Sequence, residues 1–117
     1  MPTGNKLGRF VAIGYTAAKG GVVQITRTLA VQLAPLQVRV NAIAPAFVHT
    51  NLGDGLLQET VTAPVVLAAH AEILRRTPLG RWGEPDDLKG IAVFLASSAS
   101  AYCTGYTYAV DGGWLAL

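Results

Sequence analysis

Cysteine is almost missing from this 117-residue sequence, which contains only Cys103. A lone cysteine excludes an internal disulfide and a metal site built from several thiolates, and it suits a small packed side chain in a reducing compartment. Charged residues are also scarce, at 14% of the chain against about 25% in typical globular proteins. Hydrophobic residues reach 51%, the opposite of the balance in disordered chains. We therefore expect a globular protein that buries much of its surface, against itself or against a partner.

Basic clusters and long apolar runs are missing as well. The nine basic residues are scattered and the net charge is only +2. They form no basic stripe that could follow the phosphates of a nucleic acid, so a nucleic-acid partner is not expected. No apolar run reaches the roughly 18 residues that cross a bilayer, and no apolar core of signal-peptide type follows the polar first residues. The sequence therefore predicts a cytoplasmic protein without a membrane partner. His49 and His70 have no ligand-spaced neighbours, so no metal site is expected.

The first half of the chain predicts one long helix and one strand. Residues 1–14 are glycine-containing and predict a loop or weak extended structure. Residues 15–34 predict a helix, ended by Pro35, with apolar residues on more than one face and hence buried on more than one face. Residues 38–44 predict a strand, ended by Pro45.

The second half predicts two shorter helices and a second strand. The helices cover residues 65–76 and 85–97, and the acids that open the second one suit the positive end of a helix dipole. Residues 106–110 predict a strand that ends at Asp111-Gly112-Gly113. Two short strands do not make a stable parallel sheet by themselves, so the sequence predicts part of a larger α/β domain.

Tyr15 and Lys19 are the residues with the clearest chemical potential. Four residues apart on a helix, they lie on one face, one turn from each other. A phenol with a pKa of about 10 is a poor base near neutral pH, but a nearby ammonium favours the phenolate and lowers that pKa. The pair could then move a proton to or from an alcohol or carbonyl oxygen. By itself the spacing is weak evidence and favours a surface pair that supports the helix.

Five motifs occur in a fixed order, and the first contains this pair. They are Tyr-Thr-Ala-Ala-Lys-Gly-Gly-Val (15–22), Leu-Ala-Pro-Leu-Gln-Val-Arg-Val-Asn-Ala-Ile-Ala-Pro (33–45), Gly-Arg-Trp-Gly-Glu-Pro-Asp-Asp-Leu (80–88), Val-Phe-Leu-Ala-Ser-Ser-Ala-Ser (93–100) and Thr-Gly-Tyr-Thr-Tyr-Ala-Val-Asp-Gly-Gly (104–113). Over about residues 13–114 the sequence resembles the second half of the short-chain dehydrogenase/reductase family. It is most similar to the gluconate 5-dehydrogenase-like and acyl-chain reductase branches.

The resemblance implies a role for each matching residue. Tyr15 would be the proton donor or acceptor, and Lys19 would lower its pKa and hydrogen-bond the nicotinamide ribose. Pro45 would end its strand beside the cofactor, and the backbone of Val48 would lie against the nicotinamide carboxamide. Thr50 would reach the carboxamide or pyrophosphate with its hydroxyl, unless it simply caps the next segment. Residues 51–78 would correspond to the family's mobile substrate loop.

Other residues have plainer interpretations or depart from the family pattern. Asn41 is expected to satisfy backbone groups with its amide, and both tryptophans are expected to pack. Ala46 replaces the usual glycine after the proline, which matters only if the backbone φ there is positive. The family's catalytic serine would fall at Pro2, with Thr3 as the nearest hydroxyl.

The sequence thus predicts the α/β fold class, as the helix-rich C-terminal half of a Rossmann-like doubly wound parallel-sheet domain with an incomplete sheet. Residues 1–117 would form a single partial domain, because no strand precedes a glycine-rich, pyrophosphate-binding turn and the N-terminal dinucleotide-binding half is absent. The parent activity would be reversible oxidation of an alcohol or sugar-acid hydroxyl with NAD or NADP. The chain alone is expected to be inactive and to bind neither cofactor tightly.

Two alternatives remain open for what the chain does without the other half. It could be a non-enzymatic oligomerisation module, assembling with itself as a homodimer or larger, with exchange of elements as one route. Alternatively, a separate chain could supply the missing half. The small-molecule substrate and the choice between NAD and NADP are not determined by this sequence.

Overall fold

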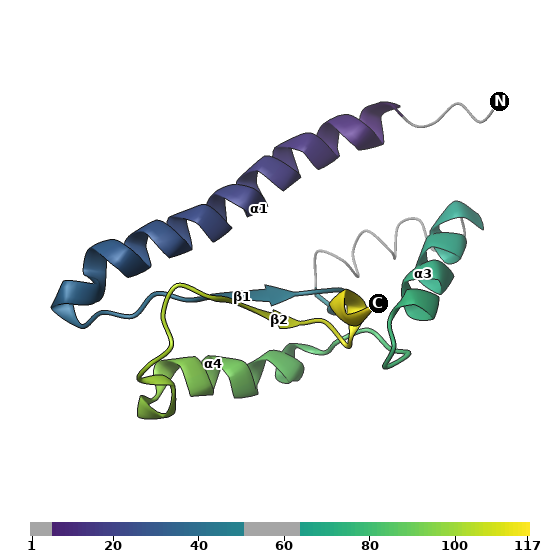
Figure 1. Ribbon diagram of the computed structural model, residues 1–117. Coiled ribbons are helices and arrows are strands. Elements are labelled where there is room, and N and C mark those ends of the chain that lie inside the picture. Colours follow the sequence, from purple (N-terminus) through teal and green to yellow (C-terminus); the bar gives the residue numbers. More distant parts are fainter. Residues whose placement is uncertain (1–5, 51–63) are drawn as a thin grey trace. The chain divides into compact units, whose positions relative to one another are not determined.

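The computed structural model describes the backbone of residues 6–50 and 64–117, and the side chains of residues 17–50, 64 and 67–117. The α/β class is as predicted (Figure 1). Along the chain the elements are helix α1 (Lys6–Leu33), 3-10 turn η1 (Ala34–Leu36), strand β1 (Ala42–Pro45), helix α3 (Pro64–Arg76), 3-10 turn η2 (Pro85–Leu88), helix α4 (Lys89–Ala96), 3-10 turn η3 (Ser98–Ser100), strand β2 (Thr107–Val110) and 3-10 turn η4 (Trp114–Ala116).

The chain divides into two compact units, which are described separately. The first unit comprises Met1–Ala42 and Tyr102–Thr107, and the second comprises Ile43–Ala101 and Tyr108–Leu117. Within the described residues, no helix has both the length and the apolar character required to cross a membrane.

Helix α1 dominates the first unit. The helix predicted from residue 15 is confirmed, but the loop predicted for residues 1–14 is wrong from Lys6 onward. Gly4, Gly8 and Gly14 suggested that loop, and the two that lie in the helix, Gly8 and Gly14, each cost it only about 0.5–1 kcal/mol. Extending an existing helix is far easier than starting one, so this cost does not stop it. At the other end, the helix tightens into η1 around Pro35, and Gln37 closes the turn with a left-handed φ of 58°.

The burial predicted for α1 differs from what the structure shows. Among its described side chains, only Thr26 and Ala30 are buried, at 5% and 3% exposure. Val22, Ile25 and Val31 remain 52–76% exposed. These apolar side chains are therefore uncovered within the first unit, because that unit contains little besides the helix and two short segments.

Strands β1 and β2 form a two-stranded sheet (Figure 1). Ala42 N–H donates to the Tyr106 carbonyl at 2.9 Å and Ala46 N–H to the Val110 carbonyl at 3.1 Å. The residue numbers of the donors and of the acceptors both increase along the sheet, so the two strands are parallel. Strand β2 matches the prediction to within one residue, whereas β1 begins at Ala42 instead of residue 38.

Just before β1, side-chain hydrogen bonds accompany one backbone bond, from Gly105 N–H to the Val40 carbonyl at 2.7 Å. Val40 N–H donates to the Thr104 hydroxyl at 3.0 Å, and the Asn41 amide donates to the Cys103 carbonyl at 2.8 Å. Asn41 also accepts from the Tyr106 N–H at 3.2 Å. Such bonds compete with strand pairing, which explains why the predicted strand starts late. The predicted role of Asn41, an amide that satisfies backbone groups, is confirmed.

The helices of the second unit occur as predicted, with one difference. Helix α3 matches the predicted range of 65–76. The predicted helix 85–97 begins as η2 and becomes α-helical only at Lys89. A capping box joins Glu84 and Asp87 at its start, which satisfies two backbone donors that the first turn leaves without partners.

Candidate active site

The segments that leave the two strands lie at one edge of the sheet. Because β1 and β2 are parallel, residues 46–50 and Asp111–Gly113 both follow a carboxyl end, the edge at which open α/β sheets bind ligands. Gln37 is the only non-glycine residue with positive φ in the described part of the chain. Ala46 is therefore free of left-handed strain, and replacing the family's usual glycine there costs little.

A second short pairing holds the segment that follows β1. Val48 forms a parallel bridge with Gly83. Gly83 N–H donates to the Phe47 carbonyl at 2.8 Å, and His49 N–H donates to the Gly83 carbonyl at 2.9 Å. A Cβ added to Gly83 would lie 3.1 Å from Val48 Cγ2, so a larger residue there would require the Val48 side chain to move by a few tenths of an ångström. Residues 47–49 are thus fixed by the loop that precedes η2.

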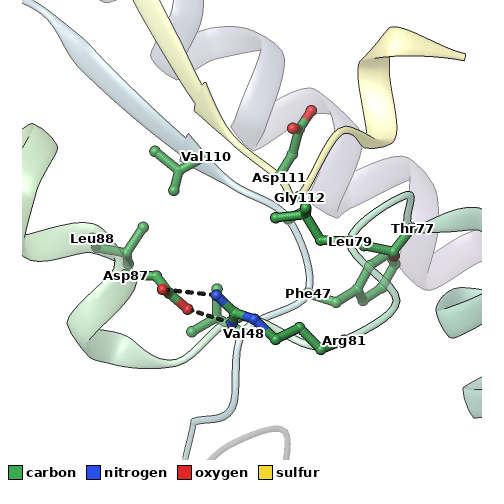
Figure 2. A pocket seen from close by; sticks show the side chains of 12 residues that line it. Phe47, Val48, Thr77, Leu79, Arg81, Asp87, Leu88, Val110, Asp111 and Gly112 are labelled. Carbon is green, nitrogen blue, oxygen red and sulfur yellow. Dashed lines mark hydrogen bonds and ion pairs between the residues drawn. The ribbon is translucent and has the colours of Figure 1, made fainter.

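A cavity of about 160 Å³ lies beside this segment. Figure 2 shows its lining, with Val110 on β2, Phe47 and Val48 on the segment after β1, and the Arg81–Asp87 pair joined by dashed lines. Ligand sites usually enclose about 300–1,000 Å³, so this cavity holds at most one ring or a small polar group.

The Arg81–Asp87 pair fixes the loop around Gly83. Arg81 donates to both carboxylate oxygens of Asp87, at 2.7 and 3.1 Å (dashed in Figure 2), and the Glu84 N–H donates to the same carboxylate at 2.7 Å. The hydrogen bond from Arg81, followed by that from the Glu84 backbone, lowers the pKa of Asp87 from its usual range to about 2. A guanidinium bound at two points holds a loop more firmly than a single contact.

The glycine turn after β2 does not form a phosphate cradle. Gly112 and Gly113 have φ of 61° and 93°, as phosphate-binding turns often do. However, the Asp111 carboxylate already accepts from the N–H groups of Gly113 and Leu115, at 2.9 and 3.0 Å. Since the donors that would hold an anion are satisfied by a negative side chain, this turn serves the fold and not a pyrophosphate.

An aromatic cluster lies next to the cavity, and no motif in the sequence indicates it. The imidazoles of His49 and His70 each stack on the indole of Trp82, with centroids 5.2 Å apart in both pairs. Phe47 contacts Trp82 and Trp114 at 5.8 and 5.2 Å. The two tryptophans pack as predicted. The histidines, expected to be isolated, come together around one ring, and no spacing in the sequence could have revealed that.

The predicted site residues fall in both units. In the second unit Pro45 ends β1, Val48 lines the cavity, and Thr50 is exposed two residues further on. In the first unit Tyr15 and Lys19 lie one turn apart on α1, and Lys19 is exposed. The Tyr15 side chain, Thr3, and residues 51–63 of the predicted substrate loop lie outside what the structure describes. The roles of these residues stay predictions.

The described residues do not hold a whole dinucleotide. The cavity beside Val48 has room for a single ring and is far too small for the complete cofactor. No strand in the described ranges leads through a glycine-rich turn into an α-helix. Nor does any group of three or more histidine, cysteine or acidic side chains suited to a metal ion occur in the portion that the structure describes.

Comparison with known proteins gives a consistent result. A family model described as Enoyl-(Acyl carrier protein) reductase matches residues 5–115. The chain is 52% identical over 102 residues to the 2-dehydro-3-deoxy-D-gluconate 5-dehydrogenase of Escherichia coli K12, covering 87% of this chain and 38% of that protein. It is 40% identical to the 5-keto-D-gluconate 5-reductase of the same strain, covering 95% and 41%.

Solved structures resemble the chain over similar ranges. A short chain dehydrogenase family protein from Francisella tularensis superposes with a TM-score of 0.79 at 33% identity, covering 88% of this chain and 43% of that one. A protein assigned as a 2-deoxy-D-gluconate 3-dehydrogenase, from Agrobacterium tumefaciens and with bound NADP, superposes with a TM-score of 0.75 at 45% identity, covering 88% and 39%. The chain thus spans about two fifths of the length of these relatives. Its two strands correspond to part of the Rossmann-type sheet of the solved structures.

Proposed function

This chain belongs to the short-chain dehydrogenase/reductase family, and on that premise we propose that it carries the acid–base part of an NAD(P)-dependent oxidoreductase site. The observation that supports the proposal most directly is the position of Tyr15 and Lys19 on one unbroken helix, α1. Four residues along a helix is one turn, which lets an ammonium lie close to a phenol oxygen.

The chemistry follows from that spacing. In the oxidation direction the hydroxyl of the substrate gives its proton to the Tyr15 phenolate while its carbon gives up a hydride, and in reduction both steps reverse. Lys19 stabilises the phenolate because its positive charge favours the ionised form of a neighbouring acid. A bound nicotinamide supplies the hydride acceptor or donor.

The segment after β1 is proposed to hold the nicotinamide end. Pro45 ends the strand, the backbone of Val48 borders the cavity, and the Thr50 hydroxyl follows at the same edge of the sheet. Whether the cofactor is NAD or NADP depends on groups that this segment does not contain. The Agrobacterium tumefaciens protein was solved with NADP, and this does not decide between NAD and NADP for this chain.

The proposed substrate is an alcohol, with a sugar-acid hydroxyl favoured. The two curated relatives from E. coli are named for gluconate derivatives and share 52% and 40% of the aligned residues with this chain. Because the chain spans only 38% and 41% of their lengths, we propose that it is inactive alone and needs a dinucleotide-binding part, either in the same polypeptide or on a separate chain.

A fusion protein tests the proposal. The chain would replace the matching part of the E. coli 2-dehydro-3-deoxy-D-gluconate 5-dehydrogenase, and nicotinamide absorbance would follow turnover of that enzyme's substrate. We expect turnover from the fusion and none from the chain alone. A folded fusion that binds cofactor but does not turn over would refute the proposal.

A second candidate function is a non-enzymatic homo-oligomerisation module. The observation that favours it is the exposed apolar surface of α1, where Ile25 and Val31 are 58% and 76% exposed. Exposed apolar surface of this kind is usually covered by a partner. Light scattering with and without NAD(H) separates the two functions. A dimer or larger assembly whose oligomeric state does not change with NAD(H) supports the oligomerisation module. A monodisperse monomer at micromolar concentration excludes it.

A further inference from the structure

Trp82 occupies a central position among the rings of the second unit. Its indole stacks on His49 at an interplanar angle of 26° and on His70 at 18°, both at 5.2 Å between centroids. Its buried Nε1 has no hydrogen-bond partner among the described residues. Ring packing, and not a hydrogen bond, therefore sets the orientation of this indole.

The two histidines belong to different parts of the unit. His70 lies on α3, and His49 lies between Val48 and Thr50 in the segment that follows β1. Trp82 is adjacent to Gly83, whose backbone pairs with residues 47–49. One indole thus links a helix to the cofactor-side segment, through a ring contact on each side and a backbone pairing next to it.

The remaining contacts keep the indole in place. The Arg81–Asp87 pair closes the loop that carries Trp82, and Phe47 packs against the indole at 5.8 Å. Glu84 Oε1 lies 3.9 Å from His49 Nε2, an exposed contact that adds little to the ring stacking. The ring contacts thus run without a break from His70 on α3 through the indole to His49.

We infer that Trp82, with His49 and His70, is a positioning residue that ties α3 to the Val48–Thr50 segment and so sets how the nicotinamide end is held. This inference rests on the proposed function, since it requires that Val48 and Thr50 border the cofactor. None of the three side chains touches the reacting atoms in this scheme. Their effect is on the placement of the segment that does.

The first test examines the stack in the chain itself. The sequence contains two histidines, so ¹³C-histidine labelling gives two imidazole signals, assigned with His49→Gln and His70→Gln. An indole face shifts the resonances of rings stacked on it. We expect Trp82→Leu to displace both signals, Trp82→Phe to displace them less, and His70→Gln to displace the His49 signal. Trp114→Phe is the control and should change both far less. If both imidazole signals keep their chemical shifts in a folded Trp82→Leu variant, the inference is overturned.

The second test examines the consequence for the cofactor in the fusion protein. We expect His70→Gln to raise the KM for the nicotinamide cofactor by about twofold to tenfold, the range that corresponds to one lost stacking contact, with little change in kcat. His70→Phe keeps an aromatic ring and should restore the KM. Arg75→Gln, on the same helix, removes only an exposed ion pair with Glu72 and should leave both constants unchanged.

The outcomes separate the two proposals. A wild-type fusion that folds but does not turn over refutes the proposed function, and the positioning role with it. If the fusion turns over substrate and His70→Gln leaves its KM for the cofactor unchanged, the positioning role alone is overturned. A raised KM that His70→Phe fails to restore overturns the role of stacking.

Discussion

Arg81 and Asp87 form an ion pair at two points, with Nη1 2.7 Å from Oδ2 and Nη2 3.1 Å from Oδ1. Six residues separate them, which is not a helical spacing, so the pair closes a loop instead of supporting a helix face. The loop carries Trp82 and Gly83, which both contact the segment after β1. This exposed ion pair is therefore connected to the candidate site through the backbone between its partners.

Acid should weaken the loop in a defined window. The pKa of Asp87 is lowered to about 2 in the folded protein, against about 3.9 in an unfolded chain. A lowered folded-state pKa stabilises the fold above the unfolded pKa, and that stabilisation is lost as pH falls through the folded value. The difference in unfolding free energy between wild type and Asp87→Asn should therefore be constant above about pH 5 and shrink toward pH 2.

Urea unfolding at a series of pH values measures this difference. Asp86→Asn provides a matched control one residue earlier, where the carboxylate pairs with Lys89 at an exposed position. Its effect should be smaller, since the Asp86 carboxylate is 80% exposed and pairs with a single ammonium, whereas the Asp87 carboxylate is 35% exposed and accepts from both Arg81 and the Glu84 N–H. A difference for Asp87→Asn that persists unchanged at pH 2 would contradict the prediction.

Gly112→Ala should destabilise the second unit. Gly112 has a φ of 61°, and a Cβ there would lie 2.9 Å from Thr77 Cγ2. A left-handed non-glycine residue costs about 1–3 kcal/mol, and the contact adds to this. Thermal unfolding measures the loss. Gly90→Ala is the control, because nothing lies within 4 Å of its Cβ position in α4, and it should be neutral or stabilising by about 0.5–1 kcal/mol.

Tyr15→Phe should abolish turnover in the fusion protein while cofactor binding survives, because the ring remains and only the titrating oxygen is lost. Lys19→Ala should impair both, since the proposed ribose contact and the stabilisation of the phenolate disappear together. Lys19→Arg should rescue poorly, because a planar fork does not replace a compact ammonium. The pH–rate profiles of the three variants test these roles. More than a few per cent of wild-type turnover in Tyr15→Phe would show that the assignment is wrong.

The chain alone should not bind NAD(H) tightly. The donors of the glycine turn after β2 are already bonded to Asp111, and the cavity beside Val48 accommodates only one ring. Calorimetric titration of the isolated chain should therefore give no micromolar binding of NAD(H), whereas the fusion should bind it. Micromolar binding by the isolated chain would refute this expectation.

Local chemistry allowed the sequence to determine several elements of this protein. The helix from Tyr15, helix α3, strand β2 and the acidic start of η2 all follow from periodicity, proline positions and capping, which involve residues a few positions apart. The family motifs also lie within short stretches, so the amino-acid sequence is sufficient to identify the family. The spacing of Tyr15 and Lys19 is of the same local kind.

Only the tertiary structure decided how distant segments meet. The bridge from Val48 to Gly83 and the stacking of His49 and His70 on Trp82 join residues far apart in sequence, and no short-range pattern encodes such contacts. The late start of β1 was likewise decided by side chains of Thr104 and Asn41 that compete with the ladder. The apolar pattern of α1 correctly predicted a helix but not its burial, because periodicity specifies which side chains share a face, whereas burial depends on what packs against that face.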